Sequence, residues 1–189
     1  MTTIDSPAVR VLFPGPLTNA EYFALPETNL RIELLDGKVV MSPSPLAIHQ
    51  RIVVALVQAF SVYARRHGGE VLVAPMDVEL SDGRVFQPDV LYVAPDGIAS
   101  VTDHVYGPPD VVVEVLSPGT RYYDLEDKRP RYAEAGVREY WAVDPGARTV
   151  TVFENDGSEL VERTAVTFGK AIPSAIAPIG HAGLSAIES

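Results

Sequence analysis

The most restrictive feature of this sequence is a single glutamate inside its most apolar run. Residues 110–116 read Asp-Val-Val-Val-Glu-Val-Leu, so Glu114 has aliphatic neighbours on both sides. A short β-branched run of this kind predicts a strand that is buried on both faces. An ionised carboxylate in such a strand is costly unless a cation compensates it. Glu114 therefore predicts either a metal site or an ion pair, for example with Arg121.

A second carboxylate, Asp89, begins another β-type run over residues 88–93. The turn signal at 81–84 predicts that this run folds back on residues 70–80 as a hairpin. Adjacent strands lie about 4.8 Å apart, so Asp89 and Glu114 on neighbouring strands can share one divalent ion. The alternative is a turn aspartate at the start of an edge strand.

The rest of the pattern predicts an α/β (α+β) fold in which helices flank a mixed β-sheet. Thr18 and Glu21 form a capping box for a short helix. Residues 30–40 predict an N-terminal β-hairpin that turns at Asp36-Gly37. Further strands are expected over residues 110–117, 139–143, 149–154 and 159–167.

Two longer helices are also predicted. The first begins at Ser44-Pro45, carries an apolar stripe, and ends at Gly68-Gly69. The second begins at Asp124 as its N-cap and ends at Gly136. Pro130 lies inside this second helix and is expected to kink it.

The length of 189 residues, with 47% hydrophobic residues, predicts one core, because cores usually divide only beyond about 250 residues. We expect a flexible segment at 1–17 and a single domain at 18–189. The absence of cysteine excludes disulfides, thiolate zinc sites and cysteine nucleophiles. The chain begins without a leader pattern and has no apolar stretch near the roughly 20 residues of a membrane span. A cytoplasmic protein with no membrane partner is expected.

The formal net charge of −10, with a pI near 4.8, has the wrong sign for a protein that binds nucleic acid through a broad basic face. A nucleic acid would therefore have to bind to a local patch of basic residues. Two clusters are candidates, unless they are merely the charged faces of surface helices. They are Arg65-Arg66-His67 and the group of Arg121, Lys128, Arg129 and Arg131.

Several sequence blocks resemble a known family. The longest is the run 107–118, GPPDVVVEVLSP, followed by Asp124, Lys128, Tyr132 and the segment 135–145, AGVREYWAVDP. Upstream blocks are 32–37, IELLDG, then 41–45, MSPSP, with His49, and the pair Pro88-Asp89. From about residue 18 to its end, the chain resembles the Uma-two type restriction endonuclease family, a branch of the PD-(D/E)XK phosphodiesterases.

The resemblance implies a restriction-endonuclease-like core in which Asp89 and Glu114 bind Mg²⁺ or Mn²⁺. In that superfamily a lysine follows the second acidic residue by two places, but here the position holds Leu116. The matching lysine of the family is displaced to the next helix, as Lys128. Its ammonium is expected to assist the attacking water or to stabilise charge on the phosphate. Without the resemblance, a helical lysine is usually solvated.

The family pattern also contains Glu33 and His49, which implies that both approach the site as further catalytic groups. From the residues alone, Glu33 alternates with Ile32 and Leu34 and would simply face solvent. His49 would be a surface residue in the first turn of a helix. Tyr132 is expected to be a core residue.

The predicted function is a metal-dependent endonuclease that hydrolyses phosphodiester bonds of DNA. The alternative is a catalytically inactive nuclease-like scaffold that binds nucleic acid or a protein partner. A homodimer or higher homo-oligomer is expected, because enzymes that cut both strands often dimerise. The apolar segment 171–179 would then cover an interface, or else close the core.

Overall fold

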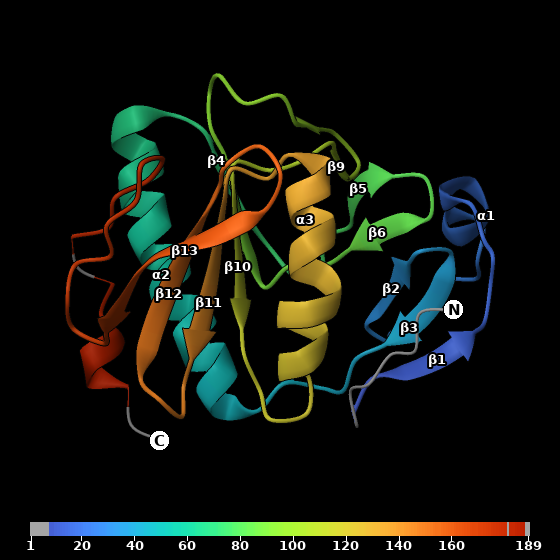
Figure 1. The fold of residues 1–189 in the computed structure, drawn as a ribbon, viewed down its shortest axis with the longest axis horizontal. Coiled ribbons are helices and arrows are strands. Elements are labelled where there is room, and N and C mark those ends of the chain that lie inside the picture. Colours follow the sequence, from blue (N-terminus) through green and yellow to red (C-terminus); the bar gives the residue numbers. More distant parts are fainter. Residues whose placement is uncertain (1–7, 181, 188–189) are drawn as a thin grey trace.

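The computed structural model describes residues 8–180 and 182–187. These residues form two mixed β-sheets with helices packed around them, as Figure 1 shows. The predicted α+β fold class is therefore confirmed, although the expected single sheet is divided into two. The first sheet has the order β1 (Arg10–Phe13), β3 (Lys38–Met41), β2 (Ile32–Leu35), β6 (Arg84–Phe86), β5 (Val78–Ser81), β9 (Val105–Tyr106) and β8 (Ser100–Val101).

The second sheet carries the buried run around Glu114. Its order is β13 (Leu160–Thr167), β12 (Thr149–Asn155), β11 (Glu139–Asp144), β10 (Val111–Val115), β7 (Val90–Val93) and β4 (Glu70–Val73). All five residues of β10 are buried, as the apolar run predicts. β10 pairs in parallel with β11 and antiparallel with β7, so it lies in the interior of the sheet.

The expected hairpin of residues 70–80 and 85–93 forms, but each of its arms is shared between the two sheets. β4 pairs with β7 in the second sheet, while β5 pairs with β6 in the first. Both crossings contain a proline, Pro75 in one arm and Pro88 in the other. Because proline has no N–H to donate, neither arm can continue its ladder through these positions. The crossing at 87–89 places Asp89 at the seam between the sheets.

The N-terminal hairpin forms as predicted. β2 and β3 are joined at Asp36 and Gly37, both of which have positive φ. The segment expected to be flexible contributes β1, which pairs with β3 at the edge of the first sheet. The part of that expectation that concerns residues 1–7 lies outside the described residues. The capping box of Thr18 and Glu21 begins α1 (Asn19–Phe23).

The long helix α2 (Ala47–His67) begins later than its predicted cap. Leu46 is the N-cap residue and has an extended conformation, so Ser44 and Pro45 remain outside the helix. The helix ends before Gly68, as predicted. By length and composition, α2 is apolar enough to cross a membrane, which the sequence analysis did not expect of any segment. Core helices pass the same test, and the apolar face of α2 packs on the second sheet.

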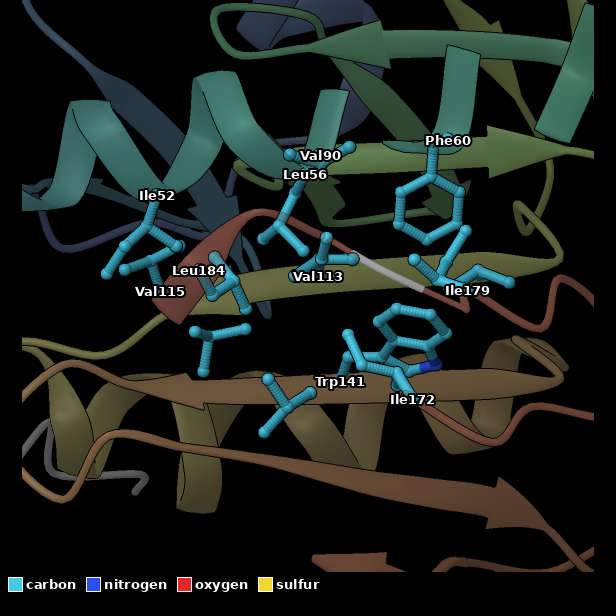
Figure 2. Packing of buried hydrophobic residues seen from close by; sticks show 14 of the residues in the cluster. Ile52, Leu56, Phe60, Val90, Val113, Val115, Trp141, Ile172, Ile179 and Leu184 are labelled. Atoms are coloured by element: carbon cyan, nitrogen blue, oxygen red, sulfur yellow. The ribbon is translucent and has the colours of Figure 1, made fainter. Parts of the chain in front are cut away.

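The main core lies between α2 and the second sheet. Figure 2 shows Ile52, Leu56 and Phe60 of α2 directed at Val113 and Trp141 of the sheet. The C-terminal chain closes this core with Ile172, Ile179 and Leu184, the last of them in the short 3₁₀ turn η2 (Leu184–Ala186). Of the two alternatives for the apolar segment 171–179, its buried side chains fit closure of the core.

The second helix differs from its prediction at its start. Helical bonding begins earlier, with the amide of Arg121 donating to Ser117 O over 2.8 Å. Asp124 is therefore not the N-cap but a buried residue inside the π-helix η1 (Tyr123–Lys128). This turn leads into α3 (Arg129–Ala135), which ends at Gly136 as expected. The π-helical turn η1 ends two residues before Pro130. At this point the helix changes from π to α geometry, in place of the simple kink that was expected.

A second buried glutamate, Glu139, fixes the C-terminal loop to β11. Its Oε2 accepts hydrogen bonds from Trp141 Nε1 (2.9 Å) and Ser174 Oγ (2.6 Å). Its Oε1 accepts from the amides of Ala175 (2.7 Å) and Ile176 (3.2 Å). One carboxylate thus accepts hydrogen bonds from four donors, one of them the indole of the buried Trp141.

We predict that Glu139→Ala lowers the free energy of unfolding by about 3 kcal/mol, since the buried Trp141 indole and the donors of the C-terminal loop lose their acceptor at once. Glu139→Gln, which keeps one acceptor oxygen, should lose less. Urea denaturation of both variants measures the difference, with the exposed Glu162→Ala as a control expected to stay within about 0.5 kcal/mol of the wild type. Equal stability of Glu139→Ala and the wild type would contradict this role of the loop anchor.

Candidate active site

The centre of the candidate site is the ammonium group of Lys128, whose side chain is 1% exposed. Its Nζ lies 2.9 Å from Oε1 of Glu33 on β2 and 2.5 Å from Oε1 of Glu114 on β10. These strands belong to different sheets, and Lys128 comes from the helical segment η1. One side chain therefore joins both sheets and a helix.

Aromatic side chains surround this ion-pair group. Tyr123 OH donates to Glu33 Oε2 over 3.0 Å, and Tyr132 OH donates to Glu114 Oε1 over 3.1 Å. The rings of Phe86, Tyr123 and Tyr132 lie 5.6–5.9 Å from the Lys128 ammonium, within the range of cation–π attraction. Tyr132 is thus a core residue, as expected, whose hydroxyl also contacts the site.

Asp89 lies beside this group on the neighbouring strand. The pairing of Val90 with Val113 places Asp89, just before β7, across from Glu114 on β10. Asp89 Oδ1 is 2.9 Å from Arg31 Nη2, and its Oδ2 is 2.9 Å from His49 Nε2. The amide of Val115 also donates to Oδ2 over 2.8 Å. The two carboxylates predicted from the sequence therefore meet on adjacent strands.

Burial and mutual repulsion set the protonation of these groups. Burial raises the pKa of Glu114 to about 7, with Asp89 and Glu33 adding to the rise and Lys128 opposing it. Burial would also raise the pKa of Asp89, but the His49 hydrogen bond and the Arg31 charge lower it to about 2. Negative charge is therefore in excess around Glu114.

Burial and the neighbouring charges also shift the pKa values of Lys128 and Asp124. Burial favours the neutral amine of Lys128, but the carboxylates of Glu114 and Glu33 outweigh it and raise the Lys128 pKa above its ordinary value. Burial, with the charge of Glu114, raises the pKa of Asp124 well above its usual range. The site thus favours a protonated Lys128 and disfavours the ionised form of Asp124.

A cavity of about 710 Å³ opens over these residues. Its base contains all five residues that the sequence analysis named for the site, Glu33, His49, Asp89, Glu114 and Lys128. Two proline-containing loops, 42–46 and 117–121, form its walls together with the turn 144–146. Arg121, suggested from the sequence as a partner of Glu114, instead pairs with Asp144 at this cavity, with 2.5 Å between Nη1 and Oδ2.

The site chemistry fits a divalent cation in part. Among residues 8–180 and 182–187, no group of three or more His, Cys, Asp or Glu side chains is arranged as a metal cluster. Asp89 and Glu114 nevertheless offer carboxylate oxygens on one cavity wall, and Mg²⁺ and Mn²⁺ prefer oxygen ligands. The raised pKa of Glu114 also reflects unbalanced negative charge, which a cation would offset. The residues present therefore fit such an ion with few protein ligands.

Three further residues of the site were not anticipated. Arg31 binds Asp89, Tyr123 binds Glu33, and the amide of Gln87 donates to Glu33 Oε1 over 2.7 Å. The signal for Arg31 was available, since residues two apart on a strand share a face and Glu33 was already a candidate. Gln87 and Tyr123 approach from segments far away in sequence, which a local pattern cannot reveal.

The expected basic patch around Lys128 does not form. Lys128 is buried, Arg129 donates to the carbonyls of Leu125 and Leu160, and Arg131 pairs with Asp36. These side chains are used inside the fold because the helix packs against both sheets. Of this cluster, Arg121 alone lines the cavity together with Lys128.

Comparison with known proteins identifies the family of this chain. The family model of Uma2, described as "Putative restriction endonuclease", matches residues 20–182. This chain belongs to the Uma2 family. The resemblance predicted from the sequence is therefore confirmed over most of the chain, and it assigns this Uma2 protein to a group described as nucleases.

A solved structure shares the Uma2 chain's fold. It is the crystal structure of "a putative nuclease belonging to DUF820" from Anabaena variabilis, with a TM-score of 0.68 and 19% sequence identity. The match covers 84% of the Uma2 chain and 89% of the other. No curated protein matches the chain.

We predict that Lys128→Met lowers the free energy of unfolding by about 3–5 kcal/mol, because it leaves Glu114 and Glu33 buried without their cation. Chemical denaturation in EDTA measures the loss. The exposed Lys170→Met is a matched control and should change stability by less than about 0.5 kcal/mol.

A double variant separates charge from packing. If the loss comes from uncompensated carboxylates, adding Glu114→Gln to Lys128→Met should recover part of it. If the double variant is less stable than Lys128→Met by the full cost of Glu114→Gln alone, the two side chains are not coupled and the ion-pair account fails.

The raised pKa of Glu114 predicts a pH-dependent stability. Between its ordinary value of 4.5 and about 7, the folded protein holds a proton that the unfolded chain has lost. The contribution of Glu114 to stability should therefore be largest below pH 4.5, fall as the pH rises to about 7, and then stay constant. Denaturation in EDTA across this range should show a fall in the wild type that is absent from Glu114→Gln; parallel curves would contradict it.

Proposed function

We propose that this protein is a metal-dependent endonuclease that hydrolyses phosphodiester bonds of DNA. The observation that carries the proposal is the meeting of Lys128, Glu114 and Asp89 at the base of one cavity. Membership of the Uma2 family supports nuclease chemistry at this position. The carboxylates lie on adjacent strands, which suits the sharing of one ion.

Asp89 and Glu114 are the residues that would hold Mg²⁺ or Mn²⁺. When bound, such an ion polarises a phosphate oxygen and lowers the pKa of a water molecule. Arg31 and His49 fix the two oxygens of Asp89, and the amide of Val115 adds a third contact. These contacts hold the Asp89 side chain in one orientation before a substrate arrives.

Lys128 is proposed to act as a charged donor. The carboxylates around it keep it protonated at neutral pH, so it cannot accept a proton from water in this state. It can orient the attacking water and stabilise negative charge that develops on the phosphate. Glu33, on β2 of the first sheet, holds the ammonium in place. His49 contacts Asp89 and so supports the pair of carboxylates formed by Asp89 and Glu114. In these roles Lys128, Glu33 and His49 serve the reaction.

A second candidate is a nuclease-like scaffold that binds nucleic acid or a protein without cutting it. Two observations favour it. Both oxygens of Asp89 already have cationic or donor partners within 2.9 Å. The net charge of −10 also disfavours tight binding of a polyanion.

The proposal retains the homodimer or higher oligomer and the cytoplasmic location expected from the sequence. The core buries three residues of the segment 171–179, namely Ile172, Ala177 and Ile179. The interface of an oligomer would therefore have to use a different surface.

We predict that Mn²⁺ binds the wild type but neither Asp89→Asn nor Glu114→Gln, as measured by titration calorimetry. Lys128→Gln should keep metal binding, because the lysine is not a ligand and the amide can still donate to both carboxylates. Its nicking of plasmid DNA and cutting of single-stranded circular DNA should fall by about 10², the scale of losing one preorganised charged donor.

Circular dichroism confirms that each variant is folded at the assay temperature. Equal cutting by the wild type and Lys128→Gln would refute the role of the lysine. A wild type that cuts neither DNA form in Mg²⁺ or Mn²⁺ would favour the scaffold. Unchanged Mn²⁺ binding in both carboxylate variants would remove the proposed metal site.

A further inference from the structure

A second cavity adjoins the candidate active site. It measures about 300 Å³ and lies between α2 and the end of β4. Arg31, His49 and Asp89 line both this cavity and the larger one. These three side chains therefore form the boundary between the two cavities, and a ligand that occupies both must pass them.

The walls of the second cavity combine apolar surfaces with amide groups. Val53, Val54 and Val57 of α2 face it, as do Val73 and Ala74 at the end of β4. The amides of two further α2 residues, Gln50 and Gln58, complete the lining. Apolar contact together with side chains that both donate and accept hydrogen bonds is the chemistry that recognises a nucleobase.

The boundary itself has incomplete hydrogen bonding. Nε of Arg31 and Nδ1 of His49 are buried and have no hydrogen-bond partner. A buried polar atom without a partner is costly, so such atoms usually have a partner. Arg31 Nε thus keeps an N–H to donate beside Asp89. Because His49 Nε2 donates to Asp89, Nδ1 of the neutral imidazole keeps a lone pair to accept a hydrogen bond.

We propose that the second cavity is a subsite for one unpaired nucleobase, next to a phosphate held at the boundary by the Arg31 guanidinium. The proposal rests on the proposed function and adds the substrate class. A base can enter a pocket of this kind only after it has left the base stack of a duplex. The substrate is therefore single-stranded DNA, or a nucleotide displaced from a duplex.

The charge of the protein agrees with this substrate class. Duplex binding depends mainly on many contacts between basic residues and phosphates, and a chain with net charge −10 is poorly suited to them. Contact between a base and the apolar lining of the cavity removes apolar surface from water and needs no basic face. A single strand can thus be held with few cationic contacts.

The test measures binding without hydrolysis. A fluorescent single-stranded oligonucleotide, its duplex, and a single strand with abasic sites are titrated in EDTA and in Ca²⁺, with anisotropy as the readout. We expect the single strand to bind at least about tenfold more tightly than the other two, since only it places a base in the cavity.

Two matched variants on α2 locate the subsite. Val54→Trp fills the cavity from a position that is 54% exposed, so folding should persist, and it should weaken single-strand binding about tenfold. Val62→Trp, at a 41% exposed position of the same helix outside this cavity, should leave binding unchanged.

Three results would overturn the subsite. They are equal binding of single strand and duplex, equal binding of the abasic strand, or no effect of Val54→Trp. Absence of any single-strand binding in both buffers would also overturn it. A different result would reject the proposed catalysis but leave the subsite in place. In that result the protein hydrolyses no DNA, yet it binds the single strand and Val54→Trp weakens this binding. The two failures are therefore distinguishable.

Discussion

The ion pairs of one buried lysine organise this protein. Lys128 neutralises Glu33 from the first sheet and Glu114 from the second, and its own burial is tolerable only because both carboxylates are present. The surrounding tyrosine hydroxyls complete the hydrogen bonding. The relative position of the two sheets and the shape of the cavity between them therefore depend on a polar contact inside an apolar core.

This arrangement explains why a buried strand can carry an acidic residue. Burial, together with the charges of Asp89 and Glu33, raises the pKa of Glu114, and a cation beside it would oppose this shift. Such a site is costly for folding, which is typical of groups kept for function rather than for stability. The main core on the opposite face of the second sheet is apolar and contributes the stability that the site does not.

Much of this fold could be predicted from local sequence patterns. The buried strand β10, the turn at Asp36-Gly37 and the helix end at Gly136 each follow from residues within a few positions of one another. The candidate residues also came together as the family resemblance implied. The patterns failed where distant segments decide the outcome. The division of one hairpin between two sheets and the contact of Gln87 with Glu33 depend on the packing of the whole chain.

The π-helix η1 has a consequence for how this site can change. A π turn contains one residue more than the α-helical turn it replaces, so it corresponds to a single-residue insertion in an ordinary helix. Deleting one residue between Tyr123 and Lys128 would restore the α-helical register and rotate Tyr123 by about 100° relative to Lys128 and α3. Tyr123 could then no longer donate to Glu33 while Lys128 and Tyr132 kept their places. Deletion of a single codon would thus leave the fold intact while it takes the site apart.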